Sequence, residues 1–147
     1  MAERATSLNA NSAVAWQYAG WVQLYANRNE EALAQFRKGI RLNPVDPLDF
    51  EIWAGLAIAF IELKRDAEAV DAARQAVQRG PNFTISWRVL VASLVLSGGT
   101  IEAREARDEI VRLEPGYAMA RVFNHTPYIA SGMNRYREGL RLAGLPE

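Results

Sequence analysis

The sequence contains no cysteine and only one histidine, His125. The first absence excludes disulfides, thiolate nucleophiles and cysteine-ligated metals, and the second excludes a metal site with several histidines. A catalytic triad would depend on that one histidine, which stands in FNHTPY, where a turn or capping role is the simpler interpretation. We therefore expect a non-catalytic protein with no metal and no other cofactor.

Neither sign of charge is in excess, because 17 Lys and Arg balance 17 Asp and Glu. The basic excess typical of nucleic-acid-binding proteins is missing, so no nucleic-acid partner is expected. Long apolar runs are missing too: the segment 89–96 falls far short of the ~20 residues of a membrane span, and the N-terminus lacks the apolar core of a signal peptide. No membrane insertion is expected, and a cytoplasmic location fits the lack of cysteine.

What the sequence does contain is an internal repeat. Trp16, Trp53 and Trp87 are separated by 37 and then 34 residues. The same two spacings separate three prolines and three alanines, which are Pro44, Pro81 and Pro115, and Ala32, Ala69 and Ala103. A fixed period of this length indicates stacked units that bury a continuous core between neighbours, within one domain over residues 1–147.

Each unit is predicted to form two helices. Apolar residues at three-four spacing place the first helices at 13–25, 50–63 and 84–96. The second helices are expected to begin after Asn29, Asp66 and Thr100, whose side chains are good N-caps. Glu31, Glu68 and Glu102 then lie in the first helical turn, where the helix dipole favours acids, so these glutamates are interpreted as structural and not catalytic. Gly80 and Gly98 are expected to end helices in the left-handed conformation.

This pattern resembles the tetratricopeptide repeat, whose units read W-x2-L-G-x2-Y, then A-x3-F, then P. The resemblance implies an all-α, right-handed α-solenoid of antiparallel helix pairs, with repeats at 13–46, 50–83 and 84–117, the end of a preceding repeat at 1–12 and a capping segment at 118–147. The third repeat departs most, since Arg107 replaces the phenylalanine. The structural positions that match are Trp16, Gly20, Ala32, Phe36, Pro44, Trp53, Ala57, Ala69, Pro81, Trp87, Ala103 and Pro115, with the tryptophans expected as wedges between paired helices.

The tail carries a second resemblance. A short segment at 117–123 is a candidate helix, HTP at 125–127 breaks it, and 132–142 is predicted as an amphipathic helix with Met133, Tyr136 and Leu140 on one stripe, capping the last repeat. The final phrase, Tyr-x-x-Gly-Leu-Arg-x-Ala-Gly-Leu-Pro-Glu over 136–147, is similar to the ending of the repeat region in bacterial class III adenylate and guanylate cyclase-like proteins. That similarity implies a non-catalytic C-terminal regulatory region of a larger bacterial signalling protein.

The tetratricopeptide resemblance also implies a binding surface on the concave face, lined by the first helix of each repeat. By this analogy a partner would contact Tyr18, Trp21, Tyr25, Ile58, Ile61, Glu62, Arg88, Ala92 and Val95. The lining is mostly apolar, with Arg88 as a single anion contact, so a protein or peptide segment with an apolar face is the expected partner. Alternatively, the face is covered by the chain's own C-terminal helix, by a preceding repeat or by a second copy in a homodimer.

A protein–protein interaction scaffold is therefore the leading functional prediction. The alternative is a structural module that mediates self-association and has no external peptide ligand. The turn Ser97-Gly98-Gly99-Thr100 superficially resembles a phosphate-binding loop, but it lacks the GxxxxGK[ST] pattern and a preceding strand, so a helix-to-helix turn is the preferred interpretation.

Overall fold

The computed structural model describes residues 12–46, 49–117 and 132–145, and these residues form seven α-helices. The helices are α2 (Ala13–Tyr25), α3 (Asn29–Leu42), α4 (Phe50–Glu62), α5 (Asp66–Arg79), α6 (Thr84–Leu96), α7 (Thr100–Leu113) and α9 (Asn134–Leu142). The first six agree closely with the segments expected from the repeat. The expectations for residues 1–11, Pro47, 118–131 (with His125), Pro146 and Glu147 lie outside the described residues.

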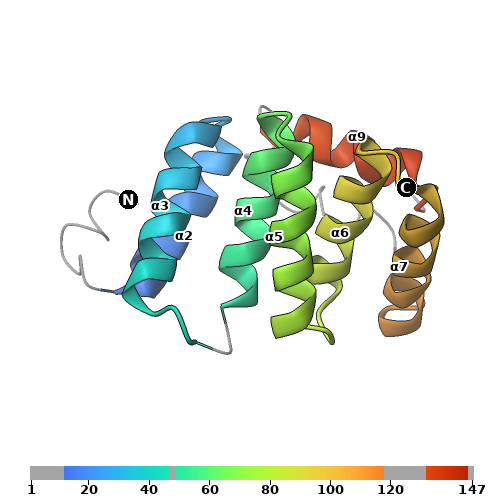
Figure 1. Ribbon diagram of the computed structural model, residues 1–147, viewed down its shortest axis with the longest axis horizontal. Helices are drawn as coiled ribbons and strands as arrows, with labels where there is room; N and C mark the ends of the chain where they lie inside the picture. The colour runs from blue at the N-terminus through green and yellow to red at the C-terminus, as the bar shows by residue number, and fades with distance from the viewer. Residues whose placement is uncertain (1–11, 47–48, 118–131, 146–147) are drawn as a thin grey trace.

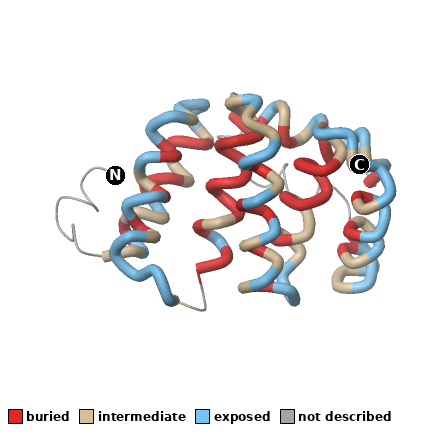
Figure 2. Tube along the Cα trace, in the orientation of Figure 1, coloured by how far each residue is buried: buried red, intermediate tan, exposed pale blue. Residues whose placement is uncertain are grey.

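The helices pack as three antiparallel pairs, α2 with α3, α4 with α5 and α6 with α7 (Figure 1). The first helices of the pairs pack on one another and make an inner layer of α2, α4 and α6, while α3, α5 and α7 form an outer layer. Helix α4 lies in the middle of the stack and is buried along almost its whole length (Figure 2). The expected all-α stack of helix pairs is therefore confirmed.

Close approach between the pairs depends on glycine and alanine. The ring of Phe36, which is fully buried, fills the space between α2 and α4. A Cβ atom placed on Gly20 would lie 2.5 Å from this ring, and one on Gly55 would lie 2.3 Å from it. Since neither glycine leaves room for a side chain, Phe36 is the wedge that joins the first two pairs. The equivalent small residues Ala32, Ala69 and Ala103 are also buried.

The tryptophans have a different role from the one expected. Trp16, Trp53 and Trp87 are half-buried at the edge of the helix layers and do not act as enclosed wedges. The indole N–H explains this position, because a buried one needs an acceptor. Trp53 Nε1 donates to Asp49 Oδ2 at 3.0 Å, and Trp87 Nε1 donates to the carbonyl oxygen of Pro81 at 2.7 Å.

The turns within the pairs correct the predicted N-caps. Asn29, Asp66 and Thr100 are the first helical residues, and the caps are Arg28, Arg65 and Gly99, which make no side-chain capping bond. Each cap N–H instead donates back to the carbonyl oxygen five residues earlier, at 2.8–2.9 Å. The preceding residues, Asn27, Lys64 and Gly98, have φ between 59° and 91°. These are Schellman turns, so the backbone sets the start of the second helix and leaves the side chains free for other partners.

The glycine expectations separate. Gly98 takes the predicted left-handed conformation with φ 91°, and the segment 97–100 is a helix-to-helix turn as preferred. Gly80 does not, because its φ is −132°, close to the extended values of Asn43 and Glu114 at the same place in the other pairs. Its glycine is required by packing, since a Cβ atom there would lie 2.6 Å from the ring of Phe50. The predicted first-turn acids Glu31, Glu68 and Glu102 are confirmed.

Candidate helix-binding groove

The inner layer is a groove that holds α9. Helix α9 packs on α6 and α4, running across them (Figure 1). The expectation was a cap on the exposed side of the last pair, but α9 instead lies on the first helices of the second and third pairs. Of the alternatives for the apolar face, cover by the chain's own C-terminal helix is the one that the structure contains.

The apolar side of α9 is the predicted stripe. Met133, Tyr136 and Leu140 are all buried, with at most 3% of any of them exposed. Gly139 lets the helix approach closely, because a Cβ atom at this position would lie 3.1 Å from the Cβ atom of Ala92. The helix is therefore fitted to the groove at the level of single atoms and is buried as a core element would be.

The N-terminus of α9 is capped by a residue from another helix. Its own cap, Met133, has φ 64° and makes no side-chain bond to the first turn. The carboxylate of Glu62, at the end of α4, accepts instead from Arg135 N at 3.2 Å and from Tyr136 N at 2.8 Å. Since these are N–H groups of the first turn, which have no acceptor within the helix, Glu62 satisfies them and also complements the helix dipole.

Arg135 adds a second connection from α9 to the middle pair. Its Nη1 donates to the carbonyl oxygen of Ile61 at 2.8 Å, and its Nη2 donates to Asp66 Oδ2 at 3.1 Å. Nη1 also contacts the other carboxylate oxygen of Asp66, so the ion pair is bidentate and only about a quarter exposed. Asp66, predicted as an N-cap, has this role because the turn before α5 is satisfied by its backbone.

Aromatic hydroxyls and one cation surround the middle of α9. Arg88 from α6 lies close enough to Tyr117 and Tyr136 for its charge to lower the pKa of each. Burial has the larger effect and raises the pKa of Tyr136 to about 12. Burial also raises the pKa of Tyr25, on which Arg88 has the same opposing effect. Arg88 therefore faces tyrosines of its own chain instead of an open groove.

The residues predicted for partner binding divide into three groups. Ile58, Ile61 and Ala92 are buried, at most 1% exposed, and a partner cannot contact them in this structure. Glu62, Arg88 and Val95 are half-buried, with Glu62 bonded to α9 and Arg88 facing its tyrosines. Tyr18 is 46% exposed, and the half-buried Trp21 and Tyr25 complete the α2 part of the predicted surface.

Sequence reasoning missed Arg135 and Asp66, because nothing local links two residues 69 positions apart. Arg135 was placed on the polar side of an amphipathic helix, where a solvated charge is the usual expectation. Among the residues that the structure describes, no three His, Cys, Asp or Glu side chains gather closely enough to hold a metal ion. The helices described here include none with the length and apolar character needed to cross a membrane.

Comparisons with known proteins agree with this geometry. Residues 19–82 match the family model described as tetratricopeptide repeat. A curated relative, the mouse interferon-induced protein with tetratricopeptide repeats 3, is 26% identical over 148 aligned residues, which cover 81% of this chain and 36% of that protein. The chain thus spans about a third of the length of that relative.

Solved structures show the same fold. The first tetratricopeptide domain of Spaghetti (RPAP3), bound to the HSP90 peptide SRMEEVD, matches with a TM-score of 0.68 at 19% identity, covering 90% of both chains. MamA matches with a TM-score of 0.70 at 14% identity, covering 97% of this chain and 82% of that one. YrrB, described as having an unusual peptide-binding site, matches with a TM-score of 0.64 at 20% identity over 97% and 72%. The fold is therefore all-α and of the tetratricopeptide type.

Proposed function

We propose that this chain, with its tetratricopeptide-type fold, is a protein–protein interaction scaffold whose inner groove binds an amphipathic helix. The fold itself suggests a scaffold, and repeats of this kind are generally non-catalytic. The observation that carries the proposal is α9, which lies across α4 and α6 with its apolar stripe buried and its N-terminus capped by Glu62. Helix α9 thus makes the contacts that a helical ligand in a groove would make.

An external partner would compete with α9 for the same contacts. It would need an apolar stripe like that of Met133, Tyr136 and Leu140, a small residue to approach Ala92, and an exposed first turn for the carboxylate of Glu62. The wider α2 surface around Tyr18, Trp21 and Tyr25 would extend the contact. In the complexes named above, the peptide belongs to those proteins; here the requirement is read from the resident helix.

A labelled peptide tests the proposal. A fluorescent peptide with the sequence of residues 132–145 is titrated into the full chain and into a full chain carrying Leu140→Ala. The substitution weakens the resident helix by about 2–5 kcal/mol, so the peptide binds the variant more tightly than the wild type. Arg141→Ala is the matched control, because Arg141 is exposed on the same helix and pairs with Glu138. Equal binding to all three proteins contradicts the proposal.

Self-association uses the same groove and is the alternative. Because both the groove and α9 belong to one chain, the helix of one copy fits the groove of another, and exchange would produce a homodimer without new contacts. Light scattering of the purified chain distinguishes the two. A monomer that binds the labelled peptide supports the external-partner function, and a dimer that Leu140→Ala dissociates supports self-association.

We further propose that the chain is the C-terminal regulatory region of a larger, cytoplasmic bacterial signalling protein such as an adenylate cyclase-like protein. The similarity of the final phrase supports this, and several of its residues belong to the helix that fills the groove: Tyr136, Gly139 and Leu140 face α4 and α6. The reading frame upstream of residue 1 is the test. A cyclase-type catalytic domain in frame is the expected result, and a stop codon there contradicts the proposal.

A further inference from the structure

The outer layer contains a groove that the inner-groove function does not use. It lies between α3 and α5, has a volume of about 530 Å³, and has Trp53, Leu56 and Phe60 of α4 as its apolar floor. That volume is within the range of about 300–1,000 Å³ found for ligand sites. Arg37 and Arg41 of α3 line one wall, and Asp71 of α5 lines the other.

The neighbouring outer groove, between α5 and α7, shows what this groove lacks. There, Arg74 of α5 and Glu102 of α7 form a bidentate ion pair that bridges the two helices, with Nη2 and Oε1 3.0 Å apart. One repeat earlier, the equivalent residues are Arg37 and Glu68. They are not paired, although both residue types are present.

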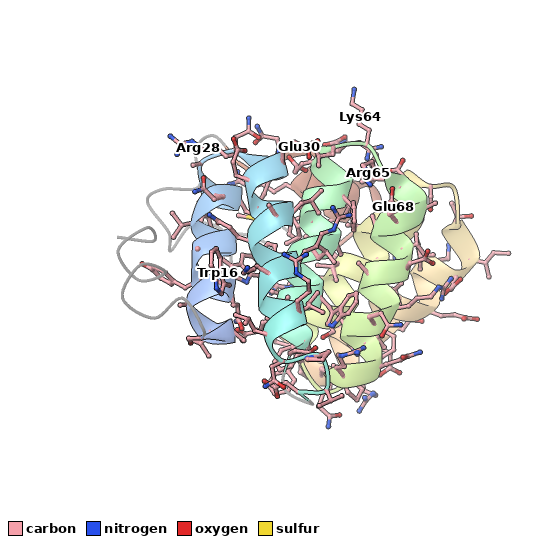
Figure 3. The ribbon with its side chains drawn as sticks, turned by 60° about the vertical axis from the view of Figure 1, so that its left-hand side comes forward. Trp16, Arg28, Glu30, Lys64, Arg65 and Glu68 are labelled. Carbon is pink, nitrogen blue, oxygen red and sulfur yellow. The ribbon has the colours of Figure 1, made fainter. Side chains whose placement is uncertain are left out.

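Arg65 is the reason for the difference. It donates to both carboxylate oxygens of Glu68, at 2.8 and 2.9 Å, and its guanidinium lies 4.9 Å from the centre of the Phe60 ring. Figure 3 shows Arg65 and Glu68 together at the start of α5, while Lys64 points away from the helices. One repeat later the residue at the position of Arg65 is Gly99, which has no side chain, so Glu102 is left to bridge to Arg74.

This arrangement leaves two exposed cations beside an aromatic floor. Arg37 lies over Phe60 at 5.6 Å, and no carboxylate within 12–46, 49–117 or 132–145 forms an ion pair with Arg37 or with Arg41 one turn later. Guanidinium groups favour bidentate contacts with carboxylates, and such charge-assisted bonds are among the stronger ones. Because Asp71 would repel an acid on the opposite side, an acidic ligand must direct its carboxylates toward α3.

We propose that the groove between α3 and α5 is a second docking site, which takes an acidic protein segment carrying one large apolar side chain. The apolar side chain lies on Trp53, Leu56 and Phe60, and the neighbouring carboxylates contact Arg37 and Arg41. The site is on the opposite layer from α9, so it is available while the inner groove is occupied.

An end-blocked peptide, acetyl-Glu-Glu-Phe-Glu-Leu-amide, tests the site by NMR titration of the full-length chain. The expected result is shifts of the Trp53 indole N–H and of amides in α3 and α5. A peptide with glutamine in place of every glutamate binds at least about tenfold more weakly, which is the loss of one charge-assisted contact. No shift in this groove, or equal binding of the two peptides, overturns the proposal.

Matched variants locate the contact. Arg37→Gln with Arg41→Gln weakens the acidic peptide by about tenfold or more, because both carboxylate contacts are lost. Arg74→Gln, the equivalent arginine of the bridged groove, leaves the affinity unchanged. The reverse pattern, or no effect of the double substitution, overturns the proposal.

Arg65→Ala provides an independent check. Without Arg65, Glu68 is free to pair with Arg37 as Glu102 pairs with Arg74, and the new bridge closes the groove. The affinity for the acidic peptide then falls, although no residue assigned to contact the peptide has changed. An affinity equal to that of the wild type would show that Arg37 is not the anion contact and would overturn the proposal.

Discussion

At the scale of single residues, the fold depends on where side chains are too small to collide. Phe36 can be buried between α2 and α4 only because Gly20 and Gly55 present bare backbone to its ring. The sequence could indicate Gly20, since it matches a position of the repeat pattern where a small residue is expected. It could not indicate Gly55, which precedes the matching small residue, Ala57, by two positions and contacts Phe36 from the neighbouring pair.

Replacing Gly20 with leucine should therefore overpack the first pair. We expect Gly20→Leu to lower the free energy of unfolding by about 1–3 kcal/mol, because the new side chain and the Phe36 ring require the same space. Thermal unfolding followed by circular dichroism measures this. Ala34→Leu is the control, since Ala34 is exposed on α3 and its replacement should change little. Equal melting temperatures for the two variants would refute the packing role.

The buried hydroxyl of Tyr136 makes a second residue-scale prediction, on pH. Its pKa is about 12 in the folded chain, whereas an unfolded tyrosine titrates near 10. Because the folded pKa is the higher one, the stabilisation is complete below pH ~10 and is lost as the pH rises through the folded value. Tyr136→Phe should remove this alkaline loss between about pH 10 and 12. Denaturant melts at several pH values measure it, and parallel pH profiles for both proteins would contradict it.

At the scale of helices, the start and end of each element are set by backbone geometry more than by side chains. The apolar periodicity predicts the helices well, since it reflects burial. The predicted caps Asn29, Asp66 and Thr100 were wrong because Schellman turns place the cap one residue earlier. The position of α9 could not be predicted either, since its capping residue, Glu62, precedes Tyr136 by 74 residues.

Helix α9 itself should loosen when its external cap is removed. We expect Glu62→Ala to cost about 0.5–2 kcal/mol, the usual loss for an N-cap, and to speed amide hydrogen exchange at Arg135 and Tyr136. Glu138→Ala is the control, because Glu138 is exposed on α9 and bonds only to Arg141 among the printed contacts of the described chain. Protection that is unchanged in Glu62→Ala would show that this carboxylate does not hold α9.

At the scale of the whole molecule, α9 couples helix pairs that otherwise contact only their neighbours. In a linear repeat array, stability is a sum of units and interfaces, so distant units can unfold separately. Helix α9 packs on α6 while its Arg135 is bonded to Ile61 and Asp66 of the middle pair. It thereby adds a connection between the second and third pairs beyond their shared interface.

Breaking that connection should make unfolding less cooperative. We expect Arg135→Ala to lower the midpoint of urea unfolding and to reduce its slope, because α6 and α7 can then unfold before α2–α5. Hydrogen exchange resolved by residue identifies the order. Arg141→Ala, another arginine of α9, should keep the wild-type slope. A lower midpoint with an unchanged slope in Arg135→Ala would mean that the clamp stabilises the chain without coupling the pairs.

The attachment of α9 to its own groove also sets the competition that any partner meets. Effective concentrations of segments on the same chain are of the order of millimolar. A helix present at about 1 µM must therefore bind the groove about a thousandfold more tightly than α9 does, or by about 4 kcal/mol, to occupy half of the molecules. Loss of the Glu62 cap together with the Arg135 clamp would supply much of that difference. A change at these two residues alone would thus convert a groove closed to micromolar partners into one that admits them.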